Sequence, residues 1–409
     1  MIASQNDGDI KNSRILCLTT SFPGSPDDPA GFFIYQLTEA LAGQGLAVRV
    51  LTPERDRPSK NWPQSVSVHR FHYAPQRWQV LAQGPGGVPA RLRAGWKNYL
   101  LLPPFLASYA WYILTLARKA DLVLANWAVS GALAWSLSPL HRKPVVTVLR
   151  GSDAVVKGGQ IVSSSPLLKF ALKGSKAVVC VGKELEKSIK AISHHPEKVG
   201  HIPNGICEHF FLVDLPEPAP TMNIIFAGSL VPDKGVDVLL KAVERLKNLN
   251  LHLIIAGQGP LERELKELTQ RLKIEHLVTF EGQVPPGRPM AEMMSRAHFL
   301  VLPSRHEGRS NVILEAMAAG RPVIGTDTQG IRELVKDSET GFLFPDGDIS
   351  GLSRAMEKLT QDPGRLTRMG RSARQWVLDQ GLTWENTARQ YVQLFRKAMV
   401  SEPHKLRPR

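Results

Sequence analysis

The sequence has 409 residues, of which 43% are hydrophobic and 22% charged, and its formal net charge is +14. This balance is ordinary for a globular protein and excludes a disordered or fibrous chain. At about 150 residues per domain, the length predicts two or three domains. The first thirteen residues lack the features of a signal peptide and the chain has only three cysteines, so we predict a cytoplasmic protein.

Apolar strand-like runs alternate with helical patterns along the first 213 residues. The runs are RILCLTTSF, LAVRVLTP, VSVHRFHY, ADLVLANW, PVVTVLRG, KAVVCVG and KVGHIPNG. Between them, FFIYQLTEALAGQG and GKELEKSIKAI have the apolar spacing and end signals of helices. Such alternation is typical of a parallel sheet with crossover helices, so we predict a Rossmann-like domain over residues 1–213.

The same alternation restarts after DLPEPAPTM, a proline-rich stretch with the composition of a linker. Strands are predicted at NIIFAGSL, LHLIIAGQG, LVTFEGQV, HFLVLPS and RPVIGTD, helices from Lys234, Pro260 and Ser310, and three helical segments after Ile349. The simplest fold is α/β, with a second Rossmann-like domain at residues 214–385 facing the first across a cleft that holds the ligand. Residues 386–409 would add a helix and a basic tail that cross back to the first domain.

Positive charge is concentrated in the first half of the chain. Up to Asp214 there are 24 basic and 14 acidic side chains, a net +10, and the remainder has 27 and 23, a net +4. This sign favours an anionic lipid surface or a phosphate-bearing acceptor, and a solvated basic face is the alternative. No zinc-finger, leucine-zipper or RNA-binding signature occurs, so we predict no nucleic-acid partner.

The uncharged stretch from Tyr99 to Ala117, YLLLPPFLASYAWYILTLA, has two interpretations. Pro103 and Pro104 break it and leave about fourteen helical residues, or about 21 Å, which is too short to span a bilayer. The flanking cations and Trp96 would suit a helix that lies in the membrane interface. A buried helix of the first domain explains the apolarity equally well, and we favour it.

The segment HEGRSNVILEAMAAGRPVIG sets two glutamates around a predicted helix start. HFLVLPS would be a buried strand, RHEGR the turn at its carboxyl end, and Ser310 the N-cap of the next helix. The unpaired N–H groups of that helix start suit a diphosphate, and Gly308 would let the backbone approach it. Glu307 in the turn and Glu315 in the helix, about 10 Å apart, could then bind hydroxyl pairs at the two ends of a nucleotide sugar.

The longer segment PSRHEGRSNVILEAMAAGRPVIGTDTQGIRELVKDSETGFLF closely resembles the donor-binding segment of the retaining family 4 glycosyltransferases of GT-B fold. The resemblance implies that Glu307 contacts the donor hexose and Glu315 the ribose. It also implies that the first domain binds the acceptor and the second the nucleotide sugar. Backbone groups that would hold the sugar and diphosphate belong to Gly308, Ser310, Asn311 and Val312.

The run FAGSLVPDKGVDVLLKA places Lys234 at a helix start after a strand and a glycine turn, where its ammonium can reach a phosphate. It resembles the family's loop and lysine element, but Ser229 stands where the family usually has arginine. Arg305 or Arg309 could supply the missing charge. A solvated lysine in the first helical turn is the alternative.

Two glycine-containing turns are also assigned by resemblance. IIAGQGP, with Gly257 and Gly259, would lie near the nucleotide base, and packing is an equal alternative. TTSFPGSPDDPAGFFIYQL puts Gly31 before a helix start and resembles the acceptor-side glycine loop of the family.

The turn TVLRGSD ends a buried strand with Arg150 and Asp153. The resemblance places it near the donor's reacting centre, where the family often has histidine in place of Arg150. A structural pairing of the two residues within the turn is the alternative. HIPNGICEHFF resembles the signature at the end of the family's first domain: Asn204 matches, but Cys207 occupies the position of an aspartate.

Together these features predict a retaining hexosyltransferase that uses a nucleoside diphosphate sugar and a saccharide or lipid-linked acceptor in cell-surface polysaccharide or glycolipid synthesis. It would be peripheral at the inner face of the plasma membrane. An epimerase or phosphorylase on the same frame, or a binding protein without turnover, is the alternative. The departures at Ser229, Arg150 and Cys207 would favour the binding protein. We predict no cofactor and no metal, because histidines do not cluster and Asp348 has the position of a helix cap.

Overall fold

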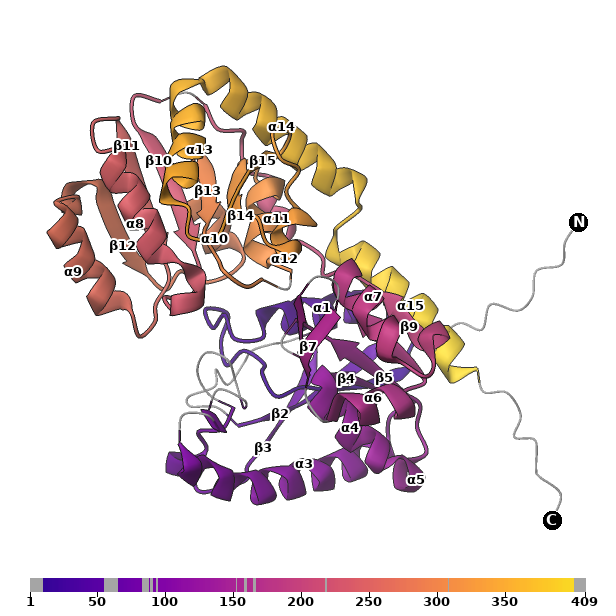
Figure 1. The fold of residues 1–409 in the computed structure, drawn as a ribbon. Coiled ribbons are helices and arrows are strands. Elements are labelled where there is room, and N and C mark those ends of the chain that lie inside the picture. The colour runs from indigo at the N-terminus through magenta and orange to yellow at the C-terminus, as the bar shows by residue number, and fades with distance from the viewer. Residues whose placement is uncertain are drawn as a thin grey trace, which may run out of the picture. The chain divides into compact units, whose positions relative to one another are not determined.

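The computed structural model describes residues 10–400 apart from 55–64, 83–87, 89–90, 93–94, 152, 158–159, 165–166, 218 and 308 (Figure 1). Its contacts divide the chain into two compact units. Unit 1 comprises Met1–Gly205 with Trp384–Arg409, and unit 2 comprises Ile206–Thr383. The chain therefore changes unit a few residues before each of the boundaries expected at residues 213 and 385.

Unit 1 contains a seven-stranded parallel sheet in the order β3-β2-β1-β4-β5-β8-β9. Its strands are β1 (Arg14–Leu18), β2 (Ala47–Pro53), β3 (Ser67–Phe71), β4 (Leu122–Asn126), β5 (Val145–Leu149), β8 (Ala177–Cys180) and β9 (Val199–His201). All seven predicted strands are thereby confirmed. Every residue of β4 and β5 is buried, as expected for parallel strands covered on both faces. An antiparallel hairpin of β6 (Ala154–Lys157) and β7 (Gln160–Ser164), which was not predicted, follows β5.

The helices of unit 1 flank this sheet. They are α1 (Phe32–Gly43), α3 (Leu102–Ala117), α4 (Trp127–Ser136), α5 (Ser138–His141), α6 (Leu167–Gly174), α7 (Lys183–Ile192) and α15 (Trp384–Met399), with short 3-10 turns that include η2 (Trp96–Leu101). The last helix joins this unit because its apolar side, with Tyr391 and Phe395, shares a core with Leu37 of α1. Its Thr387 hydroxyl also donates a hydrogen bond of 3.0 Å to the carbonyl of Pro203.

Unit 2 contains a six-stranded parallel sheet in the order β12-β11-β10-β13-β14-β15. Its strands are β10 (Met222–Ala227), β11 (Leu251–Ala256), β12 (Val278–Gly282), β13 (Phe299–Leu302), β14 (Val323–Thr326) and β15 (Gly341–Phe344). The five predicted strands are confirmed, and β15 is an addition. This order is that of the Rossmann fold, in which the strand order reverses between the first and fourth strands, here β10 and β13. Ligands of such sheets bind at the carboxyl ends of the strands at that point.

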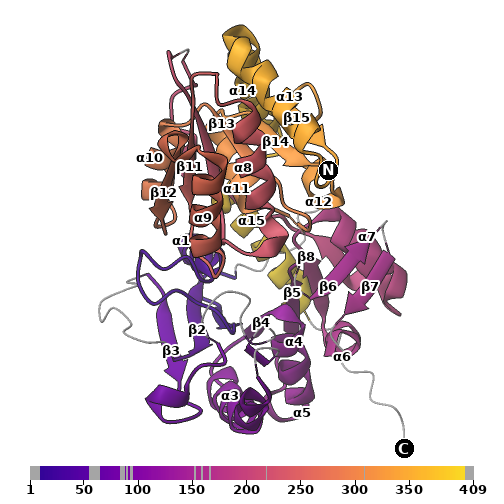
Figure 2. The same cartoon turned by 60° about the vertical axis from the view of Figure 1, so that its left-hand side comes forward.

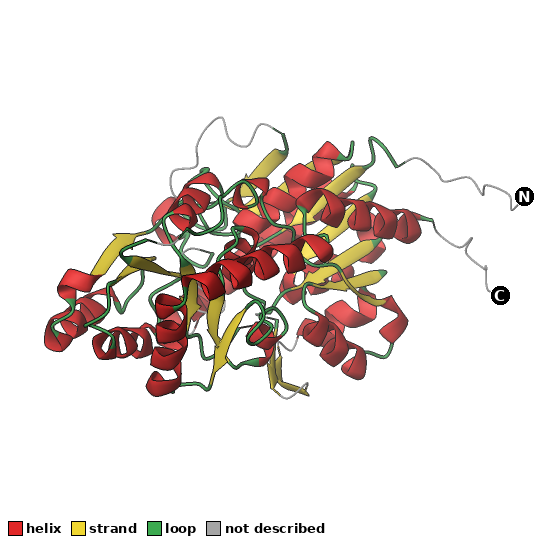
Figure 3. Ribbon diagram, turned by 90° about the horizontal axis from the view of Figure 1, so that it is seen from above, coloured by secondary structure: helices red, strands yellow, loops and turns green. Residues whose placement is uncertain are grey.

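Helices cover both faces of the second sheet (Figures 2 and 3). They are α8 (Val236–Arg245), α9 (Glu262–Leu272), α10 (Arg288–Ser295), α11 (Asn311–Ala318), α12 (Gln329–Arg332), α13 (Ile349–Gln361) and α14 (Pro363–Asp379). The three predicted closing helices are α13, α14 and α15. Asp348 caps α13 as predicted, since its Oδ1 accepts a hydrogen bond of 2.9 Å from the Gly351 amide.

Helix α3 is not the buried helix that the sequence analysis favours. It begins at Leu102, with Pro103 and Pro104 inside its first turn instead of at a break, and η2 leads directly into it. Proline is tolerated there because the first N–H groups of a helix have no intrahelical acceptor. Within the described part of the chain, Trp96–Ala117 is long and apolar enough to cross a membrane, yet only 22% of its most apolar window is buried.

Candidate functional site

The candidate site lies at the edge of the second sheet where the strand order reverses. The loop after β10, residues 228–235, meets the loop after β13, residues 303–310. The Arg305 amide donates a hydrogen bond of 2.8 Å to the carbonyl of Asp233. Gly235 has φ of +62°, and a Cβ there would lie 2.2 Å from the carbonyl oxygen of Pro303. Glycine is therefore required for the two loops to approach this closely.

This approach joins the two charged residues that the sequence singles out. The Lys234 ammonium donates to Oε1 of Glu307 in an ion pair. The side chains are only 24% and 11% exposed, so neither charge is fully hydrated. The alternative of a solvated first-turn lysine is wrong, because Lys234 closes the 3-10 turn η5 (Pro232–Lys234) and α8 begins after it. What the pair binds stays a prediction.

Helix α11 begins directly after the loop that carries Glu307. Ser310 is the N-cap residue, as predicted, and is buried, but its hydroxyl makes no capping hydrogen bond. Asn311 and Val312 form the first turn behind it. Gly308, which the sequence analysis assigns to the same turn, lies outside the described residues. The helix start thus retains the positive end of its dipole without a side-chain cap.

Glu315 lies one turn further along α11 and is half-buried. Burial raises the pKa of its carboxyl group from 4.5 to about 7. Burial is the sole cause of this shift, and no hydrogen bond from a described residue to the carboxylate offsets it. Its charge also adds to the effect of burial in raising the pKa of Cys207, the thiol at the family's aspartate position. A hydroxyl-rich ligand would supply the donors that this carboxylate lacks.

Arg309 carries the cation that best fits an anion at this site. Burial lowers the pKa of its guanidinium, and Glu333 partly offsets that effect. Its Nε and Nη1 are buried, and among the described residues neither has a hydrogen-bond partner. Arg305, by contrast, is exposed and lies 3.9 Å from Asp346. Buried N–H groups of a cation without acceptors are rare, so Arg309 is the better candidate to supply the charge missing at Ser229.

Gly257 and Gly259 have a demonstrated packing role. A Cβ on Gly257 would lie 1.8 Å from the Gly228 carbonyl oxygen, and one on Gly259 would lie 2.3 Å from that of Leu230. The loop after β11 therefore lies backbone to backbone against the loop after β10. This supports the packing alternative, and contact of these glycines with a nucleotide base stays a prediction.

In unit 1, Asp153 is a structural carboxylate. Its Oδ1 accepts a hydrogen bond of 2.7 Å from the Ala128 amide in the first turn of α4, and its Oδ2 accepts one of 2.7 Å from the Arg150 amide. Burial raises its pKa to about 6 against the effect of these two donors. The pairing expected within the turn is thus made through the backbone of Arg150. A catalytic role for Asp153 stays a prediction.

The Arg150 guanidinium joins three strand ends of the first sheet. It donates a hydrogen bond of 3.0 Å to Oδ1 of Asn204 and one of 2.9 Å to Oδ1 of Asn126. Its Cζ lies 4.4 Å from the centroid of the Phe33 ring. Burial lowers its pKa. The predicted residues Arg150 and Asn204 are therefore in direct contact, and both lie at carboxyl ends of strands.

Two neighbours in this cluster were missed in the sequence. Asn126 ends β4, and Trp127, which begins α4, has φ of +67°, a strained conformation for a bulky residue. The sequence signal that could have identified Asn126 was a side-chain amide directly after an apolar run in ADLVLANW.

Gly31, predicted for a turn of this unit, is the N-cap residue of α1 and has φ of +73°. A Cβ there would lie 2.3 Å from the Ser21 carbonyl oxygen.

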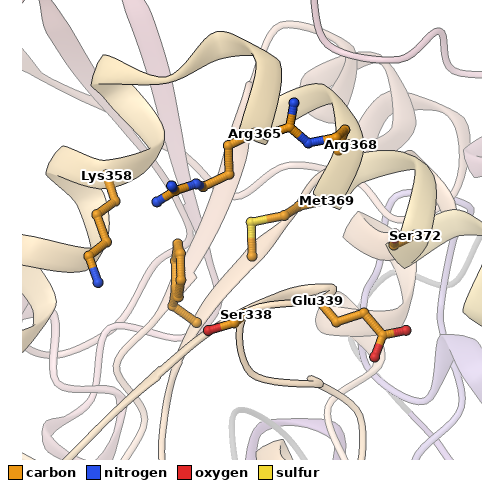
Figure 4. A pocket seen from close by; sticks show the side chains of 8 residues that line it. Ser338, Glu339, Lys358, Arg365, Arg368, Met369 and Ser372 are labelled. Carbon is orange, nitrogen blue, oxygen red and sulfur yellow. The ribbon is translucent and has the colours of Figure 1, made fainter.

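Two cavities of unit 2 lie away from the Lys234–Glu307 pair. One, of about 490 Å³, is lined by Lys358 of α13, Arg365 and Arg368 of α14, and Ser338 and Glu339 of the loop before β15 (Figure 4). The other, of about 390 Å³, has Asp214, His298 and Arg321 among its lining residues. Neither is lined by a predicted site residue. The candidate site is therefore identified by the charged side chains that its loops bring together, and not by the volume of a cavity.

Among the residues that the structure describes, no group of three or more His, Cys, Asp or Glu side chains could hold a metal ion.

Comparison with known proteins agrees with this geometry. The family profile "Glycosyl transferases group 1" matches residues 213–376, and "Glycosyltransferase Family 4" matches residues 30–209. The chain belongs to the group 1 glycosyltransferases and has the GT-B fold. It is therefore a glycosyltransferase, and the resemblance found in the sequence is confirmed.

Relatives match nearly the whole length of this glycosyltransferase. A D-inositol 3-phosphate glycosyltransferase of Corynebacterium glutamicum is 26% identical over 415 aligned positions, which cover 93% of this chain and 94% of that protein. Sucrose-phosphate synthase of Thermosynechococcus elongatus has a similar fold, with a TM-score of 0.77, 23% identity and coverage of 96% and 100%. HepE of Anabaena, solved with UDP and glucose, has a TM-score of 0.74 at 18% identity, with coverage of 94% and 100%.

Proposed function

We propose that the protein transfers a hexose from a nucleoside diphosphate sugar, with retention of anomeric configuration, to a saccharide or lipid-linked acceptor in the cytoplasm. The observation that carries this proposal is the Lys234–Glu307 ion pair beside the uncapped start of α11. It lies at the strand-order reversal, where Rossmann-like sheets bind nucleotides. The relative HepE was solved with UDP and glucose, which supports this class of donor.

The arrangement supplies charge where a departing diphosphate needs it. When the bond between the anomeric carbon and the phosphate oxygen breaks, negative charge develops on the diphosphate. Lys234, the buried Arg309 guanidinium and the amide end of α11 would stabilise that charge. The acceptor hydroxyl would attack from the face that the diphosphate leaves, and an oxygen of the leaving group would take its proton.

Each carboxylate has a separate task in this proposal. Glu307 would accept hydrogen bonds from hexose hydroxyls and hold the ammonium of Lys234 in place. Glu315 would accept hydrogen bonds from the ribose hydroxyls. The chemistry requires neither a protein nucleophile nor a cofactor, and we propose that the reaction is independent of metal ions.

The test is a transfer assay with purified protein. UDP, ADP and GDP sugars would each be incubated with candidate acceptors, including inositol phosphate and lipid-linked saccharides, and release of the nucleoside diphosphate and formation of product would be followed. We expect the wild type to transfer sugar from one of these donors, and the Glu307→Ala variant to have lost this transfer. Transfer that survives this change would overturn the assignment, provided that the variant melts at the wild-type temperature.

The same assay separates the rival functions. Release of free sugar or sugar phosphate without an acceptor would indicate an epimerase or phosphorylase. Nucleotide binding without turnover would indicate a binding protein, which the residues at Ser229, Arg150 and Cys207 would then explain.

A further inference from the structure

Helix α3 and the turn before it present an apolar face to solvent. We call this the outer face of α3 and define it as Trp96, Tyr99, Leu100, Pro103, Pro104, Ala107 and Trp111, all of them exposed. Its four largest side chains, Trp96, Tyr99, Leu100 and Trp111, are 71%, 54%, 67% and 65% exposed. Scattered surface apolar residues are normal, but a contiguous patch that contains two tryptophans indicates an interaction surface.

The opposite side of the helix is fixed in unit 1. Phe105, Tyr109, Ile113 and Ala117 recur every four residues and are buried in the core with Phe71. The Tyr109 hydroxyl lies 3.1 Å from Oγ of Ser130, and both groups are buried. Inserting the helix across a bilayer would remove these contacts and expose that core. The outer face can therefore meet a membrane only by lying on it.

Charge around the outer face is positive. The sequence contains no aspartate or glutamate between Asp56 and Asp121. Lys97 precedes α3 and Arg118 and Lys119 follow it, and all three are exposed. Asp121, the first acid beyond the helix, pairs with Arg14 at 2.8 Å. Exposed Arg142 follows α5, which packs against α3.

We propose that the outer face of α3 binds the surface of an anionic bilayer. Trp96, Tyr99 and Trp111 would lie at the level of the headgroups, where amphipathic rings are favoured, and the apolar side chains between them would reach the acyl boundary. The cations at both ends would attract anionic lipid, which commits the surface to a membrane and not to a neutral protein partner. This inference goes beyond the proposed reaction and does not depend on it.

Flotation with lipid vesicles tests the proposal. Full-length protein would be mixed with vesicles of phosphatidylcholine alone or with phosphatidylglycerol added. We expect binding only to the anionic vesicles, and its loss in concentrated salt, which shortens the screening length to about 3 Å at 1 M. Trp111→Glu should weaken binding by about tenfold or more, because it removes a large apolar side chain and adds a repelled charge.

Matched variants separate surface binding from damage to the fold. Leu378→Glu adds the same charge at an exposed apolar position of α14 in unit 2 and should bind like the wild type. Arg118→Ser with Lys119→Ser should weaken binding to anionic vesicles by about tenfold and leave the melting temperature unchanged. Donor binding by calorimetry should be unaffected in all three, so failure here is distinct from failure of the proposed function.

Three results would overturn the proposal. The first is absence of flotation with anionic vesicles, and the second is equal flotation of the wild type and Trp111→Glu. The third is a wild-type dimer that Trp111→Glu converts to monomer, which would assign the outer face of α3 to a second copy of the chain.

Discussion

Lys234 and Glu307 are 73 positions apart in the chain and form an ion pair. Each lies in a loop that follows a central strand of the second sheet. The pair therefore links the two strands between which the strand order reverses. An ion pair can be structural or catalytic, and reversal of its charges distinguishes the two.

The double variant Lys234→Glu with Glu307→Lys should keep the attraction and lose the function. We expect its melting temperature to lie near that of the wild type, whereas transfer falls by about a hundredfold or more, because a carboxylate then faces the departing diphosphate. Lys241 and Asp237, a half-exposed pair at 3.2 Å on α8, provide the control, and their reversal should leave transfer intact. Wild-type transfer in the reversed Lys234–Glu307 variant would make the pair purely structural.

Replacing Arg309 with methionine should change affinity and stability in opposite directions. The variant removes buried N–H groups that have no acceptor among the described residues, so the unliganded protein should be as stable as the wild type or more stable. Affinity for the nucleoside diphosphate should fall by about tenfold to a hundredfold, the range for a hydrogen bond to a charged group. Calorimetry and thermal melting measure the two effects. Arg305→Met is the control, and if it weakened affinity as much as Arg309→Met, the buried guanidinium would not be the anion contact.

Replacing Glu315 with glutamine should alter the dependence of stability on pH. Burial raises the pKa of this group from 4.5 to about 7 in the folded protein. The protonated form is therefore favoured by folding, and the free energy of unfolding of the wild type should fall relative to that of the variant as pH rises from 4.5 to 7. Urea unfolding at several pH values measures this, with Glu264→Gln on the exposed side of α9 as control. If the free energies of unfolding of Glu315→Gln and the wild type differed by the same amount at every pH, the raised pKa of the buried carboxyl group would be contradicted.

If Glu315 binds ribose hydroxyls as a carboxylate, donor affinity should rise as pH increases through about 7. Glutamine keeps one acceptor and has no charge, so the affinity of the variant should be lower and independent of pH in this range. Parallel titrations of the two proteins with the nucleoside diphosphate test this, and identical pH profiles would remove Glu315 from the ribose site.

Replacing Asp153 with alanine should destabilise unit 1 by about 2 to 4 kcal/mol, because two buried amides lose their acceptors. Asparagine should rescue this only partly, since its amide nitrogen would face one of the two N–H donors. The comparison is Asp121→Ala, which removes a largely exposed pair with Arg14 and should destabilise the protein less than Asp153→Ala. Chemical unfolding measures both. If Asp153→Ala lowered the free energy of unfolding by no more than Asp121→Ala, the structural role of Asp153 would be contradicted.

Strand positions could be predicted because parallel strands buried on both faces appear as continuous apolar runs. The short β15 and the β6–β7 hairpin were missed, since neither has a run long enough to distinguish it from a loop. The glutamates of HEGRSNVILEAMAAG were identifiable because their spacing about a helix start is a local property. The length and apolarity of α3 could also be predicted from the sequence. Which side of the helix packs on the core of unit 1 could not.

The sequence alone determined most of the strands and helices and several of the side chains at strand ends, because those depend on periodicity and on neighbours close in the chain. Only the tertiary structure decided that Lys234 meets Glu307 and that Nε and Nη1 of Arg309 are buried with no acceptor among the described residues. It also decided that Asp153 caps α4 and that α3 leaves an apolar side in solvent. These outcomes depend on packing between segments tens of residues apart, and the free energy of a contact is set by its partner and its burial, which no local pattern contains.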